Sequence, residues 1–137
     1  MISFESATFH EDDRAQRLFD VFSSLPGQIN ISHVNSTNHV VAWHKHEIQT
    51  DYWFCVKGSF KVGLAIPKSD GAYDVRWEYI SDKNPRVLKI EPGVYHGYKA
   101  LQPESIMLYY LTEKYNSNDE WNVLPGHFGE NWETLNK

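Results

Sequence analysis

The stretch "HKHEIQTDYWFCVKG", residues 44–58, places two histidines and an acid beside a β-rich run. His44 and His46 are two residues apart, so in a strand their side chains point to the same face. The residues after His46 are typical of a turn, and Asp51 then opens an aromatic run that favours a second strand. If the two strands pair, Asp51 faces both histidines. The stretch therefore predicts a polar site held between two strands.

The rest of the chain continues this pattern of short strands separated by turns. At least seven such strands at regular spacing predict a sandwich or barrel, of which the jelly roll is a natural member. We expect an all-β barrel with short N- and C-terminal extensions: a short helical turn in residues 11–20, and a short helix in residues 126–137 that packs Phe128 and Trp132 on the barrel. The expected strands are residues 29–34, 40–46, 52–56, 60–66, 73–80, 86–90, 96–100 and 106–111.

Length and charge narrow the class of protein. A chain of 137 residues is most simply one domain, residues 1–137. The net charge of −5, with no basic block, argues against nucleic acid or an anionic membrane as a partner. Cys55 is the sole cysteine, so neither an internal disulfide nor a cysteine zinc cluster is expected. The first residues do not have the pattern of a signal peptide, and no apolar run reaches the ~18 residues of a membrane helix, so we expect a cytoplasmic protein.

A third histidine extends the polar site. His96 lies in "EPGVYHGYK", residues 91–99, where Gly93 lets the backbone turn just before it. His-x-His, an acid and a glycine, followed later by Gly-x-x-His, resembles the paired motifs of the cupin superfamily. That resemblance implies a jelly-roll barrel. The sequence departs from the pattern where Asp51 replaces the usual glutamate, Asn38 replaces a leading glycine, and Pro92 lies one residue away from the expected proline.

Longer segments resemble one family within the cupins, the dTDP-4-dehydrorhamnose 3,5-epimerases. The spacing of polar and glycine positions in "YISDKNPRVLKIEPGVYHGY", residues 79–98, is similar, and "YYLTEKYNSNDEW", residues 109–121, resembles the Tyr-x-x-Thr-x-x-Tyr-x-x-x-x-Glu segment. "EDDRAQRLFDVF" and "QINISHV" resemble the family's Asp-x-Arg and Gln-x-Asn-x-Ser stretches. His-x-His followed by Gln49 also resembles the small dTDP-sugar 3,4-ketoisomerases, which share the fold.

The resemblance implies an isomerase that acts on a dTDP-4-keto-6-deoxyhexose in deoxysugar or surface polysaccharide biosynthesis. His44 stands at the position of the base that removes a proton next to the ketone, and Tyr115 at that of the acid that returns one. No cofactor is implied, and a homodimer is expected. The expected substrate-binding residues are His46, Gln49, His96, Arg14, Trp53, Tyr98 and Tyr109, and the candidates for contact with the diphosphate are Arg14, Arg86, Lys61 and Lys89.

Three supporting charges of the family are altered. The Arg-Gly-Leu-His stretch is Val41-Ala42-Trp43-His44 here, and Asp51 takes the place of the lysine that would stabilise the enolate oxygen. The aspartate that orients the histidine has no evident counterpart, so we expect Asp51 to accept a hydrogen bond from His44 or His46 instead. Because electrostatic stabilisation is usually the largest single contribution to catalysis, the standard 3,5-epimerisation is in question.

Two alternatives remain open. A metal-dependent cupin enzyme would use His44, His46, Asp51 and His96 as ligands, a mixed set that suits zinc, iron, manganese or nickel. A sugar-binding cupin without catalytic activity would keep the pocket and lose the chemistry, and the missing arginine and lysine favour it.

Overall fold

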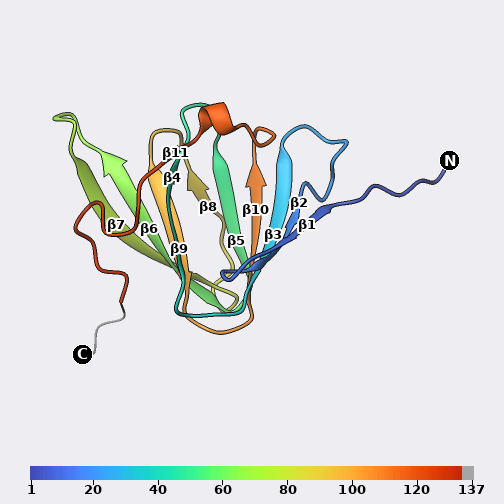
Figure 1. Cartoon of the computed structure of the whole chain (residues 1–137), viewed down its shortest axis with the longest axis horizontal. Coiled ribbons are helices and arrows are strands. Elements are labelled where there is room, and N and C mark those ends of the chain that lie inside the picture. Colours follow the sequence, from blue (N-terminus) through green and yellow to red (C-terminus); the bar gives the residue numbers. More distant parts are fainter. Residues whose placement is uncertain (134–137) are drawn as a thin grey trace.

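The computed structural model describes residues 1–133, which form two antiparallel β-sheets facing one another (Figure 1). The first sheet has the order β1-β2-β3-β10-β5-β8 and the second the order β11-β4-β9-β6-β7. The predicted all-β jelly-roll barrel is therefore confirmed. The strands are β1 (Thr8–Glu11), β2 (Gln16–Phe19), β3 (Gln28–Val34), β4 (Val40–Lys45), β5 (Asp51–Lys57), β6 (Ser59–Pro67), β7 (Tyr73–Ser81), β8 (Leu88–Ile90), β9 (Tyr95–Ala100), β10 (Ser105–Leu111) and β11 (Trp121–Asn122), with a 3-10 turn η1 (Ser117–Asp119) before the last.

All eight predicted strands are present, from β3 to β10, but the helical turn predicted for residues 11–20 is wrong. Those residues end β1 and form β2, which pair as an antiparallel hairpin. The Asp12 side chain closes the turn because its Oδ1 accepts the backbone N–H groups of Arg14 and Ala15 at 2.9 and 3.3 Å. A short polar sequence that resembled a helix start is thus an aspartate-capped hairpin turn.

The tail predicted as a helix over residues 126–137 forms turns between residues 126 and 133, and its last four residues lie outside the described part of the chain. Its aromatics nevertheless pack as expected. Trp43, on the outer face of β4, is fully buried and lies with its ring centre 5.2 Å from that of Phe128 and 5.2 Å from that of Trp132. The tail therefore covers the outer face of the second sheet.

Gly63 on β6 makes room for this aromatic cluster. A Cβ atom at that position would lie 2.6 Å from Trp43 Cη2 and 2.7 Å from Trp132 Cη2, closer than side-chain carbons approach. The backbone of β6 can thus lie directly beneath both indole rings.

The space between the sheets is divided into two levels. The lower level is a dry core in which Phe60, Val62, Ala100, Met107 and Val34 are each at most 1% exposed. Above it the inward side chains become polar, and a cavity opens. Burial of large apolar side chains below, at roughly 1.5–3 kcal/mol each, stabilises the barrel that carries the polar level.

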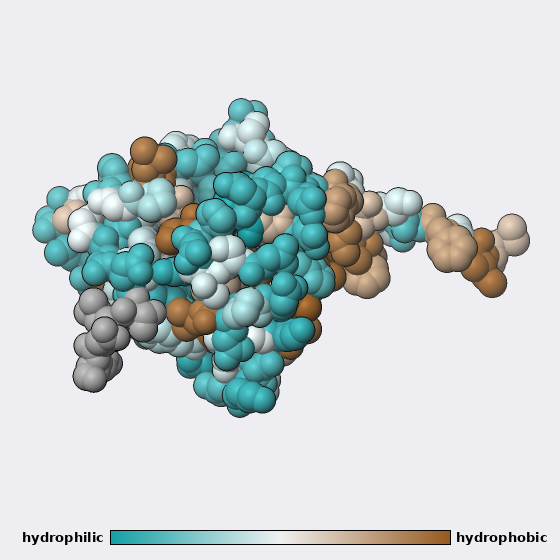
Figure 2. Space-filling view, turned by 60° about the horizontal axis from the view of Figure 1, so that its bottom comes forward, coloured by the Kyte–Doolittle hydropathy of each residue, from teal (hydrophilic) through white to brown (hydrophobic). Residues whose placement is uncertain are grey.

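The first seven residues extend away from the body of the protein (Figure 1). Figure 2 shows apolar surface along this arm, where Met1, Ile2 and Phe4 are almost fully exposed. Within residues 1–133, no helix has both the length and the apolar character needed to cross a membrane.

Candidate active site

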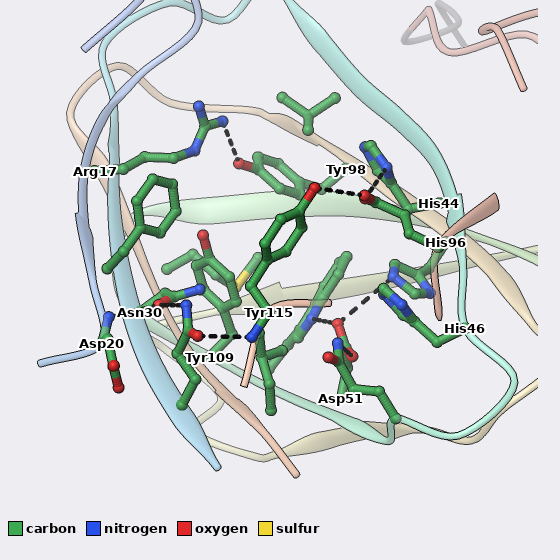
Figure 3. A pocket seen from close by; sticks show the side chains of 18 of the residues that line it. Arg17, Asp20, Asn30, His44, His46, Asp51, His96, Tyr98, Tyr109 and Tyr115 are labelled. Atoms are coloured by element: carbon green, nitrogen blue, oxygen red, sulfur yellow. Dashed lines mark hydrogen bonds and ion pairs between the residues drawn. The ribbon is translucent and has the colours of Figure 1, made fainter. Parts of the chain in front are cut away.

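A cavity of about 640 Å³ lies between the sheets and brings most of the predicted site residues together (Figure 3). Inward residues of β5, β9 and β10 form its base, while the β1–β2 hairpin and the segment around Tyr115 and Glu120 form its walls. The predicted residues that line the cavity are Arg14, His44, His46, Gln49, Asp51, Trp53, His96, Tyr98, Tyr109 and Tyr115.

Three of the predicted diphosphate-binding residues lie elsewhere. Lys61 points to the outer face of β6, with Nζ 4.3 Å from the centre of the Trp77 ring. Arg86 donates to the backbone carbonyl of Tyr79 at 2.8 Å, and Lys89 lies 3.6 Å from the Glu91 carboxylate. Strand alternation turns Lys61 and Lys89 outward, and Arg86 lies in the loop before β8. Within the described residues Arg14 is therefore the one predicted cation that lines the cavity.

His44 is held by a carboxylate that the sequence did not reveal. Its Nδ1 lies 2.6 Å from Asn122 Oδ1 and 3.1 Å from Glu120 Oε1. A carboxylate oxygen accepts a hydrogen bond, so the hydrogen of a neutral ring is on Nδ1 and Nε2 keeps its lone pair. The structure therefore provides an imidazole at the cavity wall with a nitrogen free to take a proton.

Glu120 also joins His44 to Tyr115 (Figure 3). The Tyr115 hydroxyl donates to Glu120 Oε2 at 3.2 Å, while Glu120 Oε1 faces His44. The hydrogen bond from His44 is the main cause that lowers the pKa of Glu120, and the charge of Glu120 is the main cause that raises the pKa of Tyr115. The carboxylate is thus ionised and the phenol protonated at neutral pH, as a base-orienting group and a proton donor require.

The expectation that Asp51 orients His44 or His46 is wrong. Within residues 1–133 the Asp51 carboxylate accepts its hydrogen bonds from Gln49 Nε2 at 2.7 Å and Trp53 Nε1 at 3.1 Å. His44 Nδ1 is instead held by Asn122 Oδ1 and, as the charged partner, by the Glu120 carboxylate. The signal that marks it is its place as the last residue of the Tyr-x-x-Thr-x-x-Tyr-x-x-x-x-Glu segment.

His46, Asp51 and His96 form a separate group, whose possible ligand atoms all lie within 4.8 Å of one another. His46 Nδ1 lies 2.6 Å from the carbonyl oxygen of Asp119, and His96 Nδ1 lies 3.1 Å from that of Val94. A carbonyl accepts, so both rings carry their hydrogen on Nδ1 and offer the lone pair of Nε2. Burial lowers the pKa of His96 to about 4, against the opposing effect of Asp51.

Nε2 of His46, Nε2 of His96 and the Asp51 carboxylate, which already accepts from Gln49 and Trp53, therefore converge as three acceptors at one place. Such a set fits either a divalent cation or the hydroxyl groups of a sugar, and the backbone carbonyls behind both histidines are the outer partners typical of metal ligands. His44 is outside the group, so the predicted four-residue ligand set is reduced to His46, Asp51 and His96.

Asp119 holds the loop that carries His46 and Gln49. Its buried carboxylate accepts the backbone N–H groups of Glu47 at 2.8 Å, Ile48 at 3.1 Å and Gln49 at 3.0 Å. Burial opposes ionisation, but these three hydrogen bonds dominate and lower the pKa of Asp119. The loop therefore has a fixed conformation that turns Gln49 toward Asp51.

Arg17 is a second residue that sequence reasoning missed. It lies on the inward face of β2 with its side chain 7% exposed, and its Nη2 donates to the Tyr98 hydroxyl at 3.2 Å (Figure 3). A charged side chain on a short strand is usually solvated, so an arginine at this position did not indicate a buried residue of the site. The alternation of exposed Gln16 with buried Arg17 is visible only once β2 is known to be a strand.

Tyr109 gives a prediction for alkaline stability. Burial raises its pKa to about 12, so the folded protein keeps this proton to a higher pH than the unfolded chain, whose tyrosine pKa is about 10. Stability from this group is complete below pH ~10 and is lost as pH rises through ~12, by about 3 kcal/mol. We expect Tyr109→Phe to flatten the dependence of urea-unfolding free energy on pH across this window. The control is Tyr79→Phe, because Tyr79 is exposed. If the Tyr109→Phe and Tyr79→Phe curves of unfolding free energy against pH ran parallel, the raised pKa of Tyr109 would be contradicted.

The site is thus a polar cavity between the sheets of a jelly-roll barrel, and known proteins with this fold include sugar epimerases. No family model matches the chain. CapF, a capsular polysaccharide assembling protein of Staphylococcus aureus, superposes with a TM-score of 0.74 at 17% identity, over 88% of this chain and 32% of its own. The dTDP-4-dehydrorhamnose 3,5-epimerase of Bacillus anthracis superposes with a TM-score of 0.65 at 20% identity, over 88% of this chain and 77% of its own.

Two curated proteins are similar in sequence. A probable low-salt glycan biosynthesis epimerase of Haloferax volcanii is 33% identical over 84 residues, 58% of this chain and 54% of that protein. The spore coat polysaccharide biosynthesis protein SpsL of Bacillus subtilis is 37% identical over 82 residues, 56% of this chain and 53% of that protein. The chain thus spans about half the length of the curated relatives it matches. The resemblance expected from the sequence is confirmed: the structural neighbours include a dTDP-4-dehydrorhamnose 3,5-epimerase and a 4-keto-6-deoxy sugar epimerase, and one curated relative is a probable glycan biosynthesis epimerase.

Proposed function

We propose that the protein is a nucleotide-sugar epimerase or isomerase that acts on a dTDP-4-keto-6-deoxyhexose. The observation that carries the proposal is the His44–Glu120–Tyr115 arrangement, in which one carboxylate contacts both the imidazole and the phenol at the wall of one cavity. The sugar epimerases among its relatives support the same reaction class.

The residues fit proton abstraction next to a ketone. His44 Nε2 removes a proton from the carbon beside the carbonyl, and the imidazolium that forms is stabilised by Glu120 behind Nδ1. The electron pair of the C–H bond becomes the double bond of an enolate. Tyr115, whose hydroxyl turns from Glu120 to the substrate, then returns a proton to carbon. Return on the opposite face inverts that carbon. If instead the proton of the C3 hydroxyl passes to the C4 oxygen and C4 takes the returning proton, the ketone moves from C4 to C3.

The aromatic lining suits a sugar ring. Trp53 lies edge-to-face with both His96 and Tyr98, with ring centres 5.3 and 5.7 Å apart. These aromatic rings present flat carbon surface to the C–H faces of a hexose. His46, Asp51 and His96 offer hydrogen-bond acceptors to the hydroxyl groups of the sugar. The expected homodimer stays a prediction, and a second copy would be able to cover the apolar N-terminal arm.

Proton NMR in deuterium oxide tests the proposal. With dTDP-4-keto-6-deoxyglucose as probe, we expect the protein to catalyse exchange of a proton on C3, C5 or both. Exchange at C3 alone would indicate a 3-epimerase, and exchange at both carbons a 3,5-epimerase. Exchange at C3 with migration of the ketone would indicate a 3,4-ketoisomerase. Spectra that stay unchanged over hours with folded protein would contradict the function and favour a sugar-binding protein without catalytic activity.

A metal-dependent enzyme is the second candidate, favoured by the convergence of His46, Asp51 and His96. These residues would hold the ion, and such an ion would polarise the keto oxygen as a Lewis acid. The other residues keep the roles given above.

Metal binding has its own prediction. After dialysis against a chelator, we expect zinc, manganese or nickel at about 100 times Kd to stabilise the protein by about 2.7 kcal/mol. Asp51→Asn is expected to lose this gain and His44→Gln to keep it, because His44 is outside the ligand group. Thermal unfolding with and without each metal is the measurement. A gain that Asp51→Asn retains would place the ion elsewhere.

A further inference from the structure

An enolate mechanism requires a positive partner for the oxygen that gains charge, and Asp51 stands where a lysine is expected. Among the described residues, the cations that line the cavity apart from its histidines are Arg14 and Arg17. Arg14 is half-exposed at the rim, and its Nε and Nη2 donate to Asp12 Oδ2 at 3.1 and 2.6 Å. Arg17 is therefore the buried cation that remains.

Arg17 keeps unused donor capacity inside the cavity. Of its five N–H groups, one donates to the Tyr98 hydroxyl at 3.2 Å, and Nη1 is 3.6 Å from Asp12 Oδ2, beyond hydrogen-bond length. Asp12 is already bonded to Arg14, so two guanidinium groups share this carboxylate, and it only partly neutralises the charge of Arg17. A buried guanidinium with free N–H groups stabilises a developing anion strongly, because water does not screen it.

The cavity is consequently polarised. Arg17 and the hydroxyls of Tyr98 and Tyr109 provide donors on one side, while His46, Asp51 and His96 provide acceptors on the other (Figure 3). Tyr98 and His96 are two residues apart on β9, so the two sides are separated by about 7 Å, which one hexose ring spans. A keto oxygen fits the donor side, and the hydroxyl groups fit the acceptor side.

We propose that Arg17, together with the Tyr98 hydroxyl, binds the keto oxygen and stabilises the enolate that His44 generates. This inference rests on the proposed function. When His44 takes the proton, the C–H electron pair forms the carbon–carbon double bond and the carbonyl π pair moves to oxygen, where the Arg17 N–H groups donate to it. When a proton returns to carbon, the pair on oxygen reforms the carbonyl.

The test separates stabilisation of the enolate from simple binding. Deuterium exchange into dTDP-4-keto-6-deoxyglucose is measured as kcat and KM for the wild type, Arg17→Met, Arg17→Lys and Tyr98→Phe. The control is Arg76→Met, on the exposed β7. We expect Arg17→Met to lower kcat by about 10²- to 10³-fold with KM changed only a few-fold, and Arg17→Lys to recover part of the loss. Thermal unfolding verifies that each variant is folded. If Arg17→Met does not fold, a lowered kcat in Arg17→Lys and Tyr98→Phe would support the inference, and a wild-type kcat in both would contradict it.

Each outcome has a distinct meaning. A raised KM with unchanged kcat in the Arg17 variants would make Arg17 an anchor for a phosphate and overturn the inference. Wild-type kcat in all variants would overturn it as well, while leaving the proposed function intact. A wild-type protein without exchange would overturn the proposed function itself and, with it, this role for Arg17.

Discussion

Replacing His44 with glutamine is expected to slow deuterium exchange into a 4-keto sugar by about 10²- to 10⁴-fold, the contribution of a general base. Glutamine keeps a polar side chain of similar length, but it has no lone-pair nitrogen able to take the proton. Glu120→Gln is expected to lower kcat less than His44→Gln does, because the imidazole remains while the partner of its Nδ1 loses its charge.

His127→Gln provides the matched control, since His127 is an exposed histidine remote from the cavity. The measurement is kcat for exchange, with thermal unfolding to verify that each variant is folded. A folded Glu120→Gln protein with wild-type kcat would show that the carboxylate does not act on His44. Exchange by His44→Gln at the wild-type rate would remove His44 as the base.

Replacing Trp43 with alanine is expected to lower the free energy of unfolding by about 3–5 kcal/mol, the range for a buried aromatic truncated in a core. The indole is fully buried between β6 and the C-terminal tail, in contact with Phe128 and Trp132. Its loss would leave a void above Gly63 and detach the tail. Urea denaturation followed by far-UV circular dichroism measures the change.

Trp121→Ala is the control for loss of an indole at the surface, because Trp121 is 43% exposed. Its contact with Lys45 is a cation–π interaction, worth about 0.5–1 kcal/mol at an exposed site. Similar losses in the two variants would mean that the tail does not cover the second sheet in solution.

Much of the barrel was predictable because local chemistry determines it. Strands β3 to β10 carry β-branched and aromatic residues between glycine, proline and aspartate turns, and each was found within about two residues of its real ends. The inward direction of His44, His46 and Asp51 followed from alternation and strand pairing. Gln49 and Tyr115 were predicted from the family resemblance.

The missed residues depend on contacts between distant parts of the chain. Glu120 meets His44 only because β11 pairs with β4 and brings the segment after η1 back to the cavity, which no periodicity reveals. Arg17 is buried only because β2 adds to β3 at the cavity wall. The N-terminal hairpin itself was mistaken for a helix because Asp12, Asp13 and Arg14 suit a helix start as well as a turn.

The walls of the cavity come from a hairpin near residues 8–19 and a segment near residues 112–120, whereas its base belongs to the central strands of both sheets. Each wall therefore carries residues of the proposed mechanism: Arg17 lies on the hairpin, and Tyr115 and Glu120 lie on the second segment. An engineered hairpin that is meant to admit other ligands would have to keep Arg17, whereas the central strands that form the base could stay unchanged.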